Sequence, residues 1–165
     1  MTAVWISAMY PTHKPRLQRL NFTFSNAPLY FLTLCTDQRR TLLDNHTAYE
    51  CFKEFCHLAT DHGVYVGRYV LMPDHIHLFA QVTAGSPPVS PWIKSLKNSL
   101  SKNWRTKGFA SPHWQKGFFD HVIRSADSYA EKWDYVAANP VRAGLVPTAE
   151  QWPFQGRIHD IQYER

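Results

Sequence analysis

Hydrophobic positions along the chain alternate between the spacing of strands and the spacing of helices. Four apolar runs have the length and β-branched or aromatic character of strands: 29–36, 64–72, 75–82 and 118–124. Three segments repeat apolar residues every three or four positions, as amphipathic helices do: 46–62, 92–107 and 125–138. Gly63 and Pro140 end the first and last of these helices.

The order of these elements is strand, helix, strand, strand, helix, strand and a final helix. This order predicts an α+β fold of the ferredoxin-like split βαβ plan, an antiparallel sheet with helices on one face and one added C-terminal helix. Pro73 and Asp74 separate two strands and predict a hairpin turn. The first and third strands are central in this plan, so 75–82 should lie in mid-sheet.

A chain of 165 residues with 44% hydrophobic content suits one domain. We place this domain at residues 28–146, between an N-terminal arm at 1–27 and a short tail at 147–165. The arm is interrupted by prolines and carries the basic residues Lys14, Arg16 and Arg19, which are candidate DNA contacts.

Charge is distributed unevenly along a chain whose formal net charge is +5. No acidic residue lies between Asp74 and Asp120, and the basic residues of this stretch are Lys94, Lys97, Lys102, Arg105, Lys107 and Lys116. Such a field favours a polyanionic partner, because phosphate contacts release counterions. Nucleic acid is therefore the expected partner, although a solvated helical face explains the lysines equally well.

The cysteines and the N-terminus bear on location. The three cysteines are odd in number and form no readable disulfide framework. The first ten residues lack the basic lead and long apolar run of a signal peptide or membrane span. We therefore expect a cytoplasmic protein with no membrane partner.

His75 and His77 stand two apart on a predicted strand, so both imidazoles leave one face of the sheet. They could share a metal ion, or each could bond to main-chain carbonyls. Tyr135 and Asn139 are four apart on the predicted last helix, which puts a phenol and an amide oxygen on one face. The alternative is a purely structural role, in which the tyrosine packs and the asparagine caps the helix.

Together these motifs resemble a known family. The segment His75-Ile76-His77 resembles the His-hydrophobic-His signature of HUH nucleases. The wider set resembles the REP-associated tyrosine transposases, single-tyrosine relatives of insertion-sequence transposases: 72–74, 114–115, 120–124, 133–135, 139–146 and 152–154. The resemblance covers roughly residues 25–155.

The resemblance implies a metal-dependent endonuclease and strand transferase. His75 and His77 match the ligands of Mg2+ or Mn2+, Tyr135 matches the nucleophile, and Asn139 matches the third ligand, where insertion-sequence relatives have glutamine. The implied substrate is single-stranded or hairpin DNA of the repetitive palindromic kind, cut through a 5′-phosphotyrosine intermediate. The implied protein is bacterial and nucleoid-associated, needs no small-molecule cofactor, and is favoured as a monomer over a homodimer.

The chemistry agrees with these residue types. A phenol is a poor nucleophile at neutral pH and needs a cation nearby. Tyr129 is the nearest alternative nucleophile. Four further residues are candidate DNA contacts: Trp114, His121, Arg124 and Arg142.

Three other interpretations remain. A ferredoxin-like sheet is also the RNA-recognition plan, so the chain could be a catalytically idle nucleic-acid-binding module. A phosphodiesterase with paired His-x-Ser/Thr motifs is disfavoured, because the chain has a single His-x-His. A domesticated DNA-repeat-binding protein that no longer mobilises DNA is the third interpretation.

Overall fold

The computed structural model of the chain describes residues 27–86 and 88–161. A five-stranded antiparallel sheet has the order β4-β1-β3-β2-β5. Its strands are β1 (Leu29–Cys35), β2 (Val64–Met72), β3 (His75–Val82), β4 (Phe119–Ile123) and β5 (Gln155–Arg157). The α-helices are α1 (His46–His57), α2 (Val89–Thr106), α3 (Ala126–Ala137) and α4 (Asn139–Arg142). Short 3-10 helices occupy Asp37–Arg39, Leu58–His62 and Ala149–Gln151.

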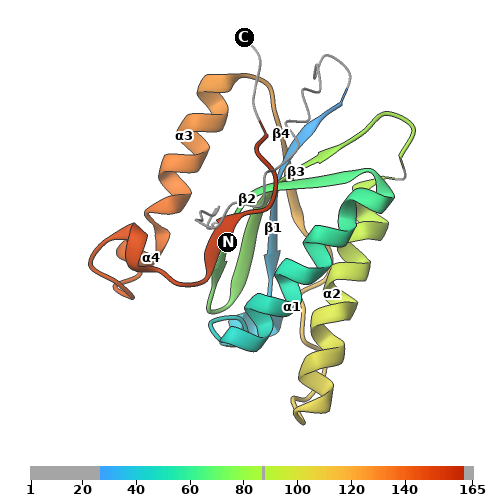
Figure 1. The fold of residues 1–165 in the computed structure, drawn as a ribbon. Helices are drawn as coiled ribbons and strands as arrows, with labels where there is room; N and C mark the ends of the chain where they lie inside the picture. The colour runs from blue at the N-terminus through green and yellow to red at the C-terminus, as the bar shows by residue number, and fades with distance from the viewer. Residues whose placement is uncertain (1–26, 87, 162–165) are drawn as a thin grey trace.

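The predicted ferredoxin-like plan is confirmed. Strand β3 lies between β1 and β2, and α1 and α2 run side by side on one face of the sheet (Figure 1). On that face Tyr69 of β2 is paired with Leu78 of β3, and its ring lies 4.8 Å from the ring of Phe52 on α1. Because side chains alternate along a strand, His75 and His77 point to the opposite face.

Helix α3 covers that opposite face (Figure 1). The ring of Tyr129 lies 4.6 Å from the ring of Phe79 on β3, and Lys132 lies over Phe31 of β1. Ser125 caps the start of α3, because its side chain accepts a hydrogen bond from Ser128 N. The C-terminal helix therefore packs on the face that carries the histidine pair.

One expectation about this helix is wrong. Tyr135 and Asn139 were expected on one face of a single helix, but α3 ends at Ala137 and Asn139 begins the separate helix α4. Pro140 explains the break, because proline has no N–H to continue the ladder and suits the first turn of a new helix. Tyr135 and Asn139 therefore belong to two helices, although Arg142 contacts both side chains.

The predicted tail that begins at residue 147 contains β5, the strand that completes the sheet. Strand β5 pairs with β2, and the indole nitrogen of Trp152 donates to the carbonyl of Leu71 at 2.9 Å. The basic arm with Lys14, Arg16 and Arg19 lies outside the described residues. Among the helices that the structure describes, none has both the length and the apolar character needed to cross a membrane.

Candidate active site

Two imidazoles form the centre of the site. His75 is 3% exposed and His77 is 0% exposed, and their ring centroids lie 5.0 Å apart with the planes nearly perpendicular. Both occupy β3, whose neighbours on either side hold them rigidly in mid-sheet. The sequence prediction that the pair shares one face of a strand is therefore confirmed.

Each imidazole is held through its Nδ1 atom. Asp74 Oδ1 lies 2.5 Å from His75 Nδ1, and Thr33 Oγ1 lies 2.6 Å from His77 Nδ1. Thr33 reaches His77 because β1 and β3 place these two residues opposite each other. The Nε2 atoms of both rings are buried, and that of His75 has no hydrogen-bond partner among the described residues.

Burial also sets the charge of these groups. Desolvation lowers the pKa of His75, although the Asp74 carboxylate opposes this shift. Burial lowers the pKa of His77 further, with added contributions from His75, Arg39 and Arg142. Desolvation would raise the pKa of Asp74, but the hydrogen bond from His75 and the charge of Arg39 outweigh it and lower the pKa. The site therefore contains two neutral imidazoles, of which His75 is hydrogen-bonded to an ionised carboxylate.

This donor set fits a divalent metal. A histidine that binds a metal through Nε2 usually donates its Nδ1–H to a carboxylate or another oxygen, as both rings can do here. Within residues 27–86 and 88–161, no group of three or more His, Cys, Asp or Glu side chains could hold a metal ion. A third protein ligand from the described residues would have to be of another type, such as an amide oxygen.

Asn139 supplies a buried amide at the start of α4, with 3% of its surface exposed. Its Oδ1 atom accepts a hydrogen bond from Arg142. The guanidinium of Arg142 also lies over the ring of Tyr135, 4.1 Å from the centroid. Arg142 thus joins the amide to the phenol, and its charge acts on His77 as well.

Tyr135 projects from α3 and is 49% exposed. It lines a hollow of about 330 Å³ together with Lys132 of the same helix and His121 of β4. His121 lies on the histidine face of the sheet, because it is paired with Phe31. The structure therefore brings His121 and Tyr135 together, as the sequence did not predict.

Comparison with known proteins decides the family. The family model of the IS200-like transposases ("Transposase IS200 like") matches residues 24–138. The chain belongs to this family. A REP-associated tyrosine transposase of Escherichia coli is 26% identical over 133 residues, which are 80% of this chain and 78% of that protein. A Haemophilus influenzae protein provisionally given the same name is 27% identical over 154 residues, 86% of each chain.

Solved structures agree with this assignment. A REP-associated tyrosine transposase bound to a REP hairpin has a TM-score of 0.65 and 26% identity, covering 77% of this chain and 74% of that one. A provisionally assigned transposase of Deinococcus radiodurans shares the fold, with a TM-score of 0.51 and 17% identity over 72% of this chain and 95% of the other. The predicted resemblance to the REP-associated tyrosine transposases is confirmed.

Tyr129 of this transposase is less suited than Tyr135 to act as a nucleophile. Its ring packs on Phe79 beneath α3, and the guanidinium of Arg68 lies over it, 5.6 Å from the centroid. Burial raises the pKa of Tyr129 to about 12. Its phenol is thus committed to packing, whereas that of Tyr135 borders an open hollow.

The predicted DNA contacts of the transposase are distributed over several surfaces. Helix α2 lies across the sheet from α3 (Figure 1). Its exposed cations are Lys94, Lys102 and Arg105, and Lys107 is exposed immediately after the helix. Lys116 is exposed in the loop before β4, and Arg124 is exposed directly after β4. Their roles in DNA binding stay predictions.

Two candidate contacts are engaged within the protein. The Lys97 ammonium donates to the carbonyls of Gln115 and Gly117, at 3.0 and 2.5 Å. The Trp114 indole donates to the carbonyl of Lys97 and packs against Trp104, with ring centroids 5.2 Å apart. These contacts hold the loop before β4 against α2.

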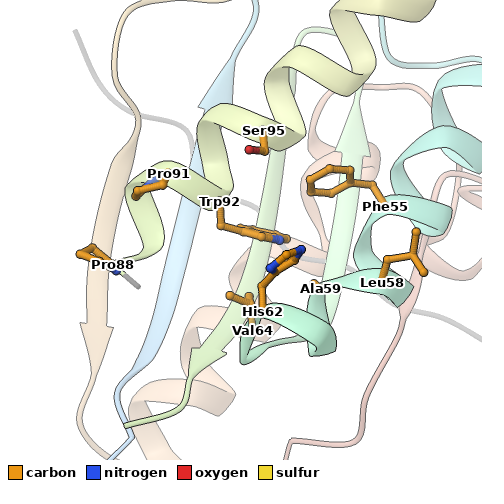
Figure 2. Close-up of a pocket in the computed structure, with 9 residues that line it drawn as sticks. All are labelled: Phe55, Leu58, Ala59, His62, Val64, Pro88, Pro91, Trp92 and Ser95. Atoms are coloured by element: carbon orange, nitrogen blue, oxygen red, sulfur yellow. The ribbon is translucent and has the colours of Figure 1, made fainter. Parts of the chain in front are cut away.

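A second hollow of about 310 Å³ lies on the helical face. Phe55, Leu58 and Trp92 form its apolar wall, and His62 is the one titratable residue among the described residues that line it (Figure 2). The histidine face, where several polar groups are clustered, is therefore the candidate active site.

Proposed function

We propose that the chain is a single-tyrosine HUH transposase that cuts and rejoins single-stranded DNA beside a hairpin, with Mg2+ or Mn2+ as cofactor. The observation that carries this proposal is the buried pair His75 and His77, with both Nδ1 atoms held by oxygens, on the sheet face that the tyrosine-bearing helix α3 covers. Membership of the IS200-like transposase family supports it.

His75 and His77 would hold the metal through their Nε2 atoms, with Asn139 as third ligand after release of its hydrogen bond from Arg142. A divalent metal bound there supplies a positive charge that polarises the scissile phosphate. Tyr135 provides the nucleophile, and Arg142 fixes its ring by stacking on it. Lys132 and Glu131 both line the hollow where the phosphate would lie, and Arg142 adds a positive charge against the ring of Tyr135.

The cleavage step conserves the phosphodiester bond energy. Tyr135 Oη attacks phosphorus, a P–O bond forms to the phenol, and the bond to the 3′ oxygen breaks. The phenolic proton of Tyr135 passes to solvent, and the departing 3′ oxygen takes up one proton from solvent and becomes a hydroxyl. Attack by another 3′-hydroxyl reverses the step, so strands can be rejoined without a high-energy cofactor.

A hairpin with a single-stranded flank is the substrate we infer. The related transposase was solved bound to a REP hairpin, at 26% identity to this chain. A phosphate must approach both Tyr135 on α3 and the histidine pair on β3, and a continuous duplex is too stiff and wide to enter between a helix and a sheet. His121 and the exposed ring of Phe119 on β4 lie at the edge of this face, where unpaired bases can stack.

The structure disfavours the idle RNA-recognition alternative. Such modules bind bases on aromatic side chains exposed on the central strands. Here the corresponding rings, Phe31 of β1 and Phe79 of β3, are both fully buried, and side chains of α3 contact them. The central strands therefore cannot stack bases without displacing α3.

The proposal is tested by comparing three labelled substrates in Mn2+. The first is a hairpin oligonucleotide with an open flank, the second has the same flank annealed to a complement, and the third is the flank without its stem. We expect cleavage of the hairpin with the open flank, none of the annealed substrate, and weaker cleavage of the flank without its stem. Equal cutting of open and annealed flanks would contradict the single-strand requirement, and binding without any cutting would favour an idle DNA-binding protein.

A further inference from the structure

The turn after β1 has an unusual backbone. Gln38 and Arg39 have φ angles of 49° and 58°, so two successive residues with side chains occupy the left-handed region that favours glycine. Residues other than glycine remain in this region only where neighbouring structure holds them, and such residues are concentrated at functional sites. Neighbouring residues must therefore hold this turn in place, and the turn is a candidate functional feature.

Neighbouring segments supply the support. Asp37 N donates to the carbonyl of His113 at 2.9 Å, and the Thr36 hydroxyl donates to the carbonyl of Arg40 at 2.7 Å. Arg40 donates to the carbonyls of Ala110 and Pro112, at 2.8 and 3.0 Å. The turn is thus tied at both ends to the loop that precedes β4.

The turn places the Arg39 side chain against Asp74 and Cys35. Its Nε atom lies 2.7 Å from Asp74 Oδ2, and its NH1 atom donates to Cys35 Sγ at 3.0 Å. Asp74 uses its other oxygen, Oδ1, for His75 Nδ1. A continuous series of contacts therefore links Arg39 to Asp74 and Asp74 to His75. It begins at a guanidinium held at two atoms and ends at one imidazole of the histidine pair.

We propose that Arg39 is a positioning residue for the metal site, which clamps Asp74 so that its carboxylate orients His75 with Nε2 directed at the metal. This inference rests on the proposed function, in which His75 binds the metal. The guanidinium suits the task because its rigid fork donates in two directions at once, to Asp74 and to Cys35. A lysine carries the same charge but has a single, rotating donor group.

The first measurement is Mn2+ affinity, read from the electron paramagnetic resonance signal of the free ion during titration. Arg39→Ala is expected to weaken Mn2+ binding about 10- to 100-fold, the usual effect of losing a group that orients a metal ligand. Arg39→Lys should restore it only in part. Arg40→Ala is the matched control, because Arg40 supports the same turn without touching Asp74, and it should leave Mn2+ affinity unchanged while lowering thermal stability.

The second measurement is covalent protein–DNA adduct formation as a function of Mn2+ concentration. For Arg39→Ala the half-saturating Mn2+ concentration should rise while the maximum at saturating Mn2+ stays near that of the wild type. A role confined to stability would not produce this separation.

Three results would overturn the inference. Unchanged Mn2+ affinity in Arg39→Ala, alongside loss of binding in His75→Ala, would reject the role of Arg39 and leave the proposed function intact. Equal weakening by Arg40→Ala would reduce Arg39 to a general support of the turn. Absence of Mn2+ binding in the wild-type protein would overturn the metal-dependent function itself, and this inference with it.

Discussion

Burial gives His75 and His77 properties that exposed histidines lack. Low pKa values keep both rings neutral at neutral pH, so their Nε2 lone pairs can bind a cation. Partners on Nδ1, Asp74 and Thr33, fix the rotation of each ring. The cost of burying two polar rings in mid-sheet is thus offset in part by hydrogen bonds, and a bound metal would satisfy His75 Nε2, which has no hydrogen-bond partner among the described residues.

At the residue scale, His75→Ala and His77→Ala should each abolish cleavage and bind Mn2+ far more weakly, because each removes a ligand. DNA affinity should change little, since phosphate contacts elsewhere are expected to supply it. Asn139→Ala should have a milder effect, because water can replace one oxygen ligand. Calorimetry with Mn2+ and a binding assay with the hairpin separate these effects.

His46→Ala is the control for the histidine variants, because His46 is exposed at the start of α1. It should retain both metal binding and cleavage. Full Mn2+ affinity in both His75→Ala and His77→Ala would show that the metal site is elsewhere.

The residue types and spacing predicted the histidine pair, but not the groups that hold it. Thr33 is 44 positions from His77 and meets it only through the β1–β3 register. Arg39 reaches Asp74 through a turn in a backbone conformation that its sequence does not signal. Such partners depend on tertiary structure, so a linear pattern cannot identify them.

Helix α2 shows how one element divides its cations between two tasks. Lys97 is half-buried and bonds to two carbonyls of the loop before β4. Desolvation lowers the pKa of Lys97. Lys94, Lys102 and Arg105 are exposed. These three exposed cations are therefore suited to phosphate contacts, whereas Lys97 is not.

Reversing Lys94, Lys102 and Arg105 to glutamate should therefore weaken hairpin binding and flatten its dependence on salt. Removal of one cation from a duplex phosphate should reduce the log–log slope by roughly 0.9. Lys97→Met is the matched control, and it should lower stability by about 1.5–3 kcal/mol, because charged hydrogen bonds are removed, while changing the slope little. Affinity titrations at several salt concentrations, with thermal melts, distinguish the two variants. An unchanged slope in the triple variant would mean that this face is only solvated.

Elements with a strong apolar period were predictable, and elements defined by pairing were not. The β2–β3 hairpin and α2 follow from apolar patterns and turn residues, and both are present. Strand β5 has the sequence Gln155-Gly156-Arg157, which has no apolar alternation, and it exists because it pairs with β2. The break between α3 and α4 was missed because residues 125–138 keep their helical period up to Pro140.

At the scale of the molecule, the two faces of the sheet have different tasks. Helices α1 and α2 bury the apolar side chains of one face, and α3 carries Tyr135 over the face that holds the histidine pair (Figure 1). The β4 edge contributes His121 to the same hollow as Tyr135. The central claim is that Tyr135 attacks the DNA from this helix.

The most direct test of this claim is a denaturing gel of the protein incubated with labelled hairpin DNA in Mn2+, followed by mapping of the DNA-bearing peptide. The wild type should form a covalent adduct on Tyr135. Tyr135→Phe should form none while retaining its fold, metal binding and DNA binding, because only the nucleophilic oxygen is removed. Tyr129→Phe, the matched control six residues earlier on α3, should form the adduct normally. An adduct that persists in Tyr135→Phe, or maps to another residue, would contradict the account.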